Sequence, residues 1–229
     1  PLVGAMAAFT VAYAGLVVLR SVDLRHAAAY LAMVPGGITT LGLAALTPLA
    51  IAGSVLSLFS GGLAAALIVA VCMTLSERAQ SRSLQVLSGL APRMPNLSWL
   101  MVLAVLGLLG VPLMASFPAE AMTFFGSFKY QPVWAFAVAA GLAVVAVAVA
   151  VIVHRVLFGA PNPDAPGVSD AALGETWFLA LLAGGLLWVG VFPGGPKLPG
   201  TDTPIFDPGL VNTMAAGITD IANLYSVQP

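Results

Sequence analysis

The stretch Gly110-Val-Pro-Leu-Met-Ala-Ser-Phe-Pro-Ala-Glu120 decides the fold. It lies inside an apolar run, Trp99–Phe128, which as one straight helix would reach about 45 Å, well beyond the hydrocarbon core of a bilayer. Pro112 and Pro118 each remove a backbone donor and clash with the preceding turn. We therefore expect a discontinuous helix that ends near Val111 and resumes near Pro118. Broken helices at membrane depth lie inside protein or beside water, and they mark transport pathways.

Glu120 comes directly after the expected break and is the only acidic residue inside any apolar run. Burying a carboxylate is costly unless the group is paired, hydrated or protonated. The first turn of a second half-helix, with Ser116 as a candidate N-cap, would instead favour the ionised form. These opposing effects suit a group that gains and loses a proton. A structural carboxylate that ties the broken helix to a neighbour is the alternative, and the sequence leaves both open.

Composition assigns the chain to the membrane. Of its 229 residues, 60% are hydrophobic and 7% are charged, and the mean hydropathy is +1.02. Soluble domains carry roughly 25% charged residues, so lipid must solvate much of this surface. Helices satisfy their own backbone groups in lipid, which favours an all-α polytopic bundle. The net charge of −1 provides no basic surface for nucleic acid.

Six apolar runs have the length of a membrane span, and the fourth is the discontinuous one. We expect residues 1–193 to form the transmembrane bundle, with the first run a retained helix rather than a cleaved signal. Residues 194–229 are expected to form an extramembrane tail with a short interfacial helix at Leu210–Tyr225. The runs are Leu2–Leu19, Ala27–Leu46, Leu49–Leu75, Trp99–Phe128, Val133–Leu157 and Thr176–Phe192.

Basic residues are distributed unevenly between the two sides of this topology. Six arginines fall in or beside linkers one, three and five, and the two lysines fall on the opposite side. The positive-inside rule then places both termini in the periplasm of a bacterial inner membrane. The arginines are Arg20, Arg25, Arg78, Arg82, Arg93 and Arg155, and the lysines are Lys129 and Lys197.

Four blocks resemble, in order and spacing, the M-type antiporter-like membrane subunit of bacterial respiratory complex I (NADH:quinone oxidoreductase), a relative of Mrp antiporters. Val111–Phe128 resembles the family's broken-helix motif, approximately L-P-G-x-x-x-F-x-G-E-F, in which Glu120 matches the proton-channel glutamate. Asp23–Tyr30 resembles D-[IL]-K-[KR]-x-[IL]-A-Y. Ser60–Arg78 resembles A-H-G-L-x-x-A followed by Y-E-R, and Val153–Gly159 resembles L-H-R-x-x-F-G.

The resemblance implies the last six helices of a fourteen-helix fold built from two inverted repeats. It also implies a membrane-arm subunit of a proton-translocating respiratory complex, in which Glu120 serves proton translocation. The departures are that the family's histidine aligns with Gly61, its Ser-His pair with Val34-Pro35, and its motif glycine with Leu113. No lysine lies within the six runs. A complete proton path would therefore need helices from another chain.

Two alternatives to this function remain open. One is a channel-dead structural subunit of such a complex. The other is a subunit of a related ion-translocating complex, namely a multisubunit Na⁺/H⁺ antiporter, a membrane-bound hydrogenase or an inorganic-carbon uptake system. In each case the partners are other membrane subunits and the lipid bilayer.

We expect no catalysis by this chain alone. It shows no phosphate loop, no metal-ligand cluster and no nucleophile with a base, so we expect no cofactor and no small-molecule substrate site on it. With a single cysteine, Cys72, a disulfide framework is excluded. NADH, flavin and iron–sulfur chemistry would belong to partner subunits. Four further residues are interfacial groups or members of a proton path, and the sequence does not separate these roles; they are Arg25, His26, His154 and Arg155.

Overall fold

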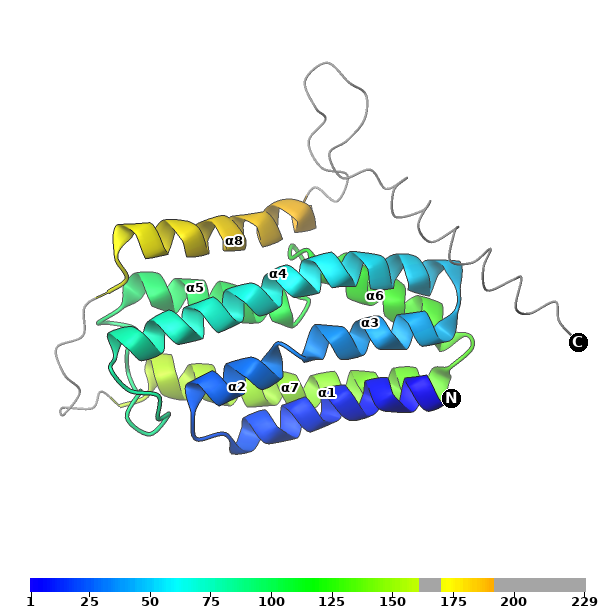
Figure 1. The fold of residues 1–229 in the computed structure, drawn as a ribbon, viewed down its shortest axis with the longest axis horizontal. Coiled ribbons are helices and arrows are strands. Elements are labelled where there is room, and N and C mark those ends of the chain that lie inside the picture. The colour runs from blue at the N-terminus through cyan, green and yellow to red at the C-terminus, as the bar shows by residue number, and fades with distance from the viewer. Residues whose placement is uncertain (161–169, 192–229) are drawn as a thin grey trace, which may run out of the picture.

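The computed structural model describes residues 1–160 and 170–191, and these residues form helices connected by turns and loops, without an extended strand. The expected all-α membrane bundle is confirmed. The expected tail 194–229, with its interfacial helix and Lys197, lies outside the described residues. Within the described ranges the helices are α1 (Leu2–Arg20), α2 (Leu24–Leu31), α3 (Val34–Ala45), α4 (Pro48–Arg78), α5 (Pro95–Leu108), α6 (Ser116–Phe128), α7 (Pro132–Phe158) and α8 (Leu173–Val191) (Figure 1).

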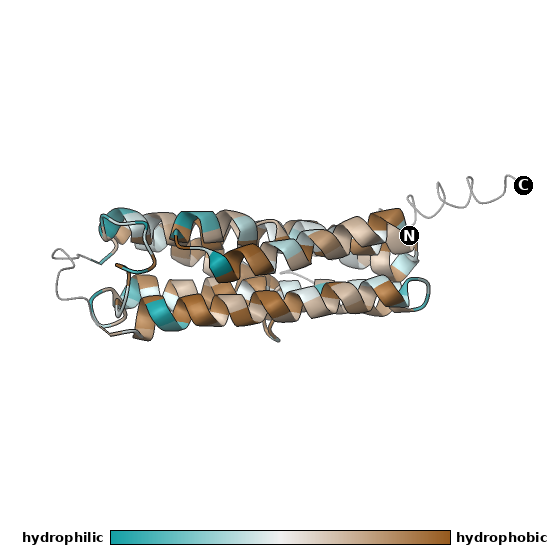
Figure 2. Ribbon diagram, turned by 90° about the horizontal axis from the view of Figure 1, so that it is seen from below, coloured by the Kyte–Doolittle hydropathy of each residue, from teal (hydrophilic) through white to brown (hydrophobic). Residues whose placement is uncertain are grey.

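Five segments of the described chain are long and apolar enough to cross a membrane: α1, the α2–α3 pair, α4, α7 and α8. Helices α5 and α6 divide the remaining predicted run between them. The helices lie side by side, with α1 packed on α7 and the long α4 packed against α3, α5, α6 and α8. Figure 2, seen from below, shows two stacked layers that are hydrophobic along most of their length. The chain is therefore a multi-pass membrane protein.

The second predicted run, Ala27–Leu46, was expected to be continuous but is interrupted in the structure. Helix α2 starts earlier, at Leu24, because the Asp23 carboxylate caps it by accepting the Arg25 N–H at 2.8 Å. The helix stops before Ala32–Met33, and α3 resumes with Pro35 in its first turn. The proline ring would clash with the carbonyl four residues earlier, so an uninterrupted helix is disfavoured there.

The segment between α4 and α5 closes one end of the bundle. Its backbone pairs with the α1–α2 turn, where Leu24 N–H donates to Arg82 O at 2.9 Å and Leu84 N–H donates to Val22 O at 2.8 Å. It also pairs with the end of α7, where Leu90 N–H donates to Val156 O at 3.0 Å. Four of its apolar side chains are almost fully buried, namely Leu84, Leu87, Leu90 and Met94. The segment looks like a polar linker in the sequence, but in the structure it packs onto the end of the bundle.

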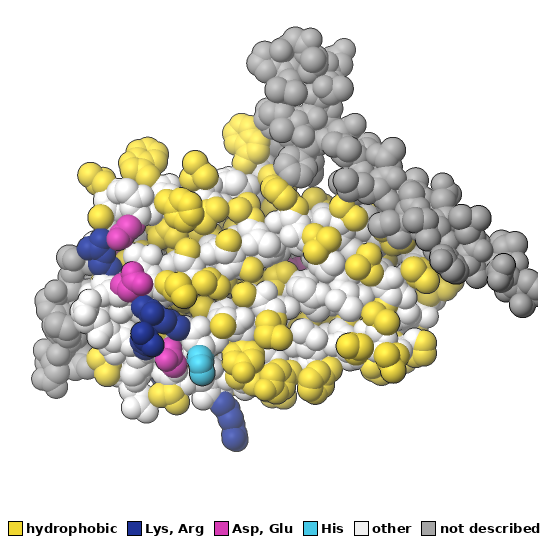
Figure 3. Space-filling model, viewed as in Figure 1, with side chains coloured by type: hydrophobic (Ala, Val, Ile, Leu, Met, Phe, Trp, Pro, Cys, Tyr) yellow, Lys and Arg dark blue, Asp and Glu magenta, His cyan; other side chains and the backbone are white. Residues whose placement is uncertain are grey.

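Charged side chains gather at the same end of the molecule (Figure 3). Arg25 of α2 pairs with Glu77 of α4 at 3.5 Å. Arg78, the last residue of α4, pairs with Glu175 of α8 at 2.7 Å. The described helices thus carry their ion pairs where α1 and α4 end, and the apolar remainder of each helix is left for the membrane.

Candidate functional site

The fourth predicted run is broken, as expected. Helix α5 ends at Leu108 and α6 begins at Ser116, with Pro112 in the interval and Pro118 in the first turn of α6. The bounds differ from the expectation, because α5 starts at Pro95 and ends about one turn earlier than Val111. Ser116 is the first helical residue and does not cap the helix; the N-cap is Ala115, without a side-chain hydrogen bond.

A glycine motif ends α5. Gly110 adopts the left-handed conformation with φ 57°, and the next residue, Val111, donates its N–H to Leu106 O at 3.2 Å. This is the geometry of a Schellman cap, in which glycine at the left-handed position satisfies the last helical carbonyls. Pro112 follows directly and prevents the helix from continuing. The break is therefore encoded by Gly110-Val111-Pro112 together.

Helix α8 braces the break from the side. Ala115 N–H donates to Leu186 O of α8 at 3.0 Å. A Cβ built on Gly190 would lie 2.7 Å from the Ala115 nitrogen and closer still to Leu113 O, so only glycine allows this approach. An irregular backbone within lipid must find partners inside the protein. The contact with α8 supplies one of them.

Glu120 is the fifth residue of α6 and lies in its second turn, so the expectation of a first-turn position is wrong. The helix begins two residues before Pro118, which moves Glu120 away from the free N–H groups. The side chain is buried, with 9% relative exposure. Its carboxyl group lies against Gly110, in the space where a side chain at position 110 would begin. Within residues 1–160 and 170–191, no hydrogen bond or ion pair to this carboxyl is found.

A seam of buried hydroxyl side chains lies between α3, α4 and α6, one turn along α6 from Glu120. Thr39 donates to Ser57 Oγ at 3.2 Å, and Ser54 donates to the Thr39 carbonyl at 3.1 Å. A Cβ built on Gly53 of α4 would lie 2.6 Å from Thr123 Oγ1, so α4 and α6 approach closely here. This seam was not predicted from the sequence, although the spacing of Ser54, Ser57 and Ser60 is visible there.

The other candidate residues are not brought to Glu120. Arg25 is held by Glu77 at the charged end. His26 is exposed and borders a surface pocket with Arg20. His154 and Arg155 are exposed near the end of α7. Glu120 lies instead in α6, against Gly110 at the α5–α6 break.

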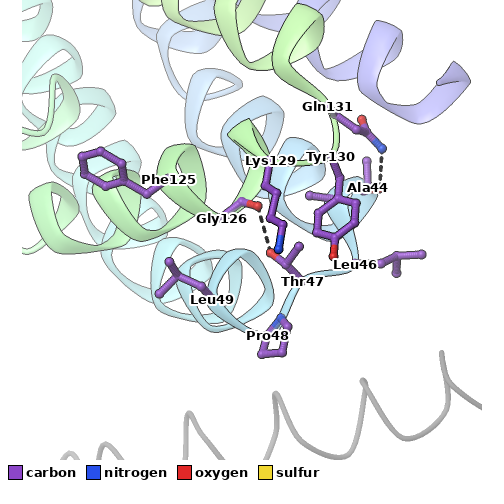
Figure 4. Close-up of a pocket in the computed structure, with 11 residues that line it drawn as sticks. Ala44, Leu46, Thr47, Pro48, Leu49, Phe125, Gly126, Lys129, Tyr130 and Gln131 are labelled. Atoms are coloured by element: carbon purple, nitrogen blue, oxygen red, sulfur yellow. Dashed lines mark hydrogen bonds between the residues drawn. The ribbon is translucent and has the colours of Figure 1, made fainter.

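A second pocket, of about 880 Å³, opens at the opposite end of the bundle, where the α3–α4 and α6–α7 turns meet (Figure 4). Thr47 joins the two turns by donating to Gly126 O at 3.0 Å, and Gln131 donates to Ala44 O at 2.6 Å. Lys129 borders this pocket, 5.5 Å from the centre of the Tyr130 ring. It follows the last residue of α6, which puts a cation at the far end of the helix that carries Glu120.

The family described as NADH:quinone oxidoreductase/Mrp antiporter, transmembrane, matches residues 1–146. The chain belongs to this family of antiporter-like membrane proteins. It is 29% identical over 194 residues to NADH-ubiquinone oxidoreductase chain 4 of Prototheca wickerhamii, covering 84% of this chain and 37% of that one. It is 29% identical over 183 residues to NADH-quinone oxidoreductase subunit M of Pseudomonas aeruginosa, covering 79% and 35%.

Solved structures share the fold. A chain of respiratory complex I from Thermus thermophilus superposes with a TM-score of 0.83 at 24% identity, covering 96% of this chain and 44% of that one. A chain of the Mrp complex from Dietzia sp. superposes with a TM-score of 0.82 at 16% identity, covering 96% and 47%. The chain thus spans less than half the length of these relatives, as the resemblance to the last helices of a longer subunit implies.

Proposed function

We propose that this chain is a membrane-arm subunit of a complex I-like, proton-translocating NADH:quinone oxidoreductase. In this proposal Glu120 belongs to a proton path that helices beyond α1–α8 complete. One observation carries the proposal: a buried carboxyl group lies directly beside a helix break in a member of the antiporter-like family. The partners are other membrane subunits of the complex, and the redox groups would lie on partner subunits.

The geometry supports proton handling by Glu120. A buried acid that has no fixed partner among the described residues can exchange its proton with water or with a neighbouring polar group. The break provides such neighbours, because broken helices in membranes border water or protein rather than lipid. The hydroxyl seam adds Thr123, Ser54 and Thr39, whose side chains can both donate and accept hydrogen bonds.

Two features support a proton path that extends beyond the described helices. No lysine lies within α1–α8, and Lys129 follows the end of α6. At the opposite end of the bundle, Arg25 pairs with Glu77 between α2 and α4, and Arg78 pairs with Glu175 between α4 and α8. We further propose that this arginine-rich end faces the cytoplasm of a bacterial inner membrane, which would place both termini in the periplasm.

The channel-dead structural subunit is the second candidate, and one contact favours it. Gly61 of α4 packs directly against Pro35 of α3. The resemblance aligns family histidines with these two positions, so the pair replaces ionisable groups with a tight apolar contact. In this alternative Glu120 stabilises the broken helix, and the chain fills the membrane arm without conducting protons.

The experiment that separates the candidates is Glu120→Gln in the assembled complex. The conducting role predicts slower proton pumping with assembly retained. The structural role predicts unchanged pumping or loss of assembly. Purifying the chain with its companions from native membrane identifies the parent complex: a redox arm supports an oxidoreductase, and its absence supports an antiporter.

A further inference from the structure

Gly110 follows the end of α5 and Glu120 belongs to α6, so their contact joins the two sides of the helix break. The C-cap of α5 does not by itself require this contact. A Cβ built on Gly110 would lie 2.5 Å from the Glu120 carboxyl carbon and 2.8 Å from Oε1, and closer still to Oε2. All three atoms nearest to this built Cβ belong to that carboxyl group. The acid therefore occupies the volume that any side chain at position 110 would need.

We infer that Gly110 is a positioning residue for the Glu120 carboxyl group, in addition to ending α5. This inference rests on the proposed role of Glu120. Because position 110 carries no side chain, the carboxyl reaches the backbone of the break itself, beside the end of α5. Any larger residue at position 110 would displace the Glu120 carboxyl group from the break.

Helix capping alone does not explain the contact. The left-handed φ of 57° already favours glycine, since other residues pay about 1 kcal/mol or more in that conformation. That cost is a property of the backbone and does not depend on which residue stands at position 120. The steric clash does depend on it, because the shorter side chain of aspartate would withdraw the carboxyl from the Cβ position. The two effects can therefore be separated by combining variants.

The test uses the intact complex with Gly110→Ala, Glu120→Asp and the double variant. The matched control is Gly89→Ala, which imposes the same left-handed strain (φ 64°) in the segment between α4 and α5. The first readout is the rate at which dicyclohexylcarbodiimide labels residue 120, followed by mass spectrometry. The second is the number of protons pumped per electron transferred.

We expect Gly110→Ala to change the labelling rate at Glu120 by at least about threefold, as for directly coupled neighbours. We also expect it to lower the number of protons pumped per electron. In the Glu120→Asp background, Gly110→Ala should change the labelling rate at residue 120 by less than about twofold. Gly89→Ala should leave labelling at Glu120 unchanged. Assembly of the double variant where Gly110→Ala alone fails to assemble would also support the inference.

Three results would overturn it. They are unchanged labelling in Gly110→Ala, an equal loss in both backgrounds, and failure of assembly in both backgrounds alike. The labelling rate reports the position of the Glu120 carboxyl group and does not depend on whether the complex pumps protons. If Glu120→Gln pumps normally, the proposed function fails while labelling still decides the positioning. If Glu120→Gln stops pumping but Gly110→Ala alters neither readout, only the positioning inference fails.

Discussion

Gly61 of α4 and Pro35 of α3 face each other across the helix interface. The proline fills the space that a side chain at position 61 would need. A Cβ at Gly61 would lie 3.2 Å from Pro35 Cγ and closer still to Pro35 Cβ. Pro35 also stands at the start of α3, just after the interruption of the second membrane segment. The contact therefore fixes both the packing of α4 on α3 and the direction in which α3 continues.

Gly61→Ala should destabilise the protein by about 1–3 kcal/mol, because the new methyl group must displace the proline ring in a packed interface. The measurement is thermal unfolding in detergent. Gly62→Ala is the control, since a Cβ built there meets nothing within 4 Å. Equal unfolding temperatures for the two variants would show that the contact between α3 and α4 does not limit stability.

Gly190→Ala should loosen the brace between α8 and the helix break. Its methyl group would collide with the Leu113–Ala115 backbone and disturb the bond from Ala115 N–H to Leu186 O. We expect a loss of about 1–3 kcal/mol and faster amide hydrogen exchange at Ala115. Gly184→Ala, with open space at its Cβ, should change neither quantity. Unaltered exchange at Ala115 in Gly190→Ala would contradict the role of α8.

Leu113→Gly should be neutral or stabilising. Leu113 has φ 82°, a conformation that suits glycine, and its side chain is exposed. Relief of left-handed strain contributes about 1–2 kcal/mol, and the added freedom of the unfolded glycine offsets roughly 0.5–1 kcal/mol of it. The control is Leu58→Gly, an exposed helical leucine in α4 that should lose about 1 kcal/mol. Similar losses in both variants, measured by thermal unfolding, would exclude strain at Leu113.

The break in the fourth run was predictable because its causes are local. Pro112, Pro118 and the length of the apolar run are visible in the sequence, and each acts on its own helix. Burial of Glu120 followed from its place inside that run. The interruption at Ala32–Met33 has an equally local cause, because Pro35 in the first turn of α3 is visible in the sequence.

The remaining features depend on contacts between distant segments. The bond from Ala115 to Leu186 joins two helices through their backbones, so no side-chain pattern encodes it. The contact of Gly110 with Glu120 needs the exact turn of the break, and the seam around Thr39 and Ser54 needs the packing of α3 on α4. Membrane orientation, the tail and the roles assigned to site residues stay predictions.

The central claim is that the buried carboxyl of Glu120 carries protons, and the ratio of protons pumped to electrons transferred tests it most directly. The purified complex is reconstituted in vesicles, with Glu120→Gln compared against Glu77→Gln, whose carboxyl is exposed at the charged end. The account predicts a lower ratio for Glu120→Gln, with the assembled complex intact, and an unchanged ratio for Glu77→Gln. An unchanged ratio in assembled Glu120→Gln complex would contradict it.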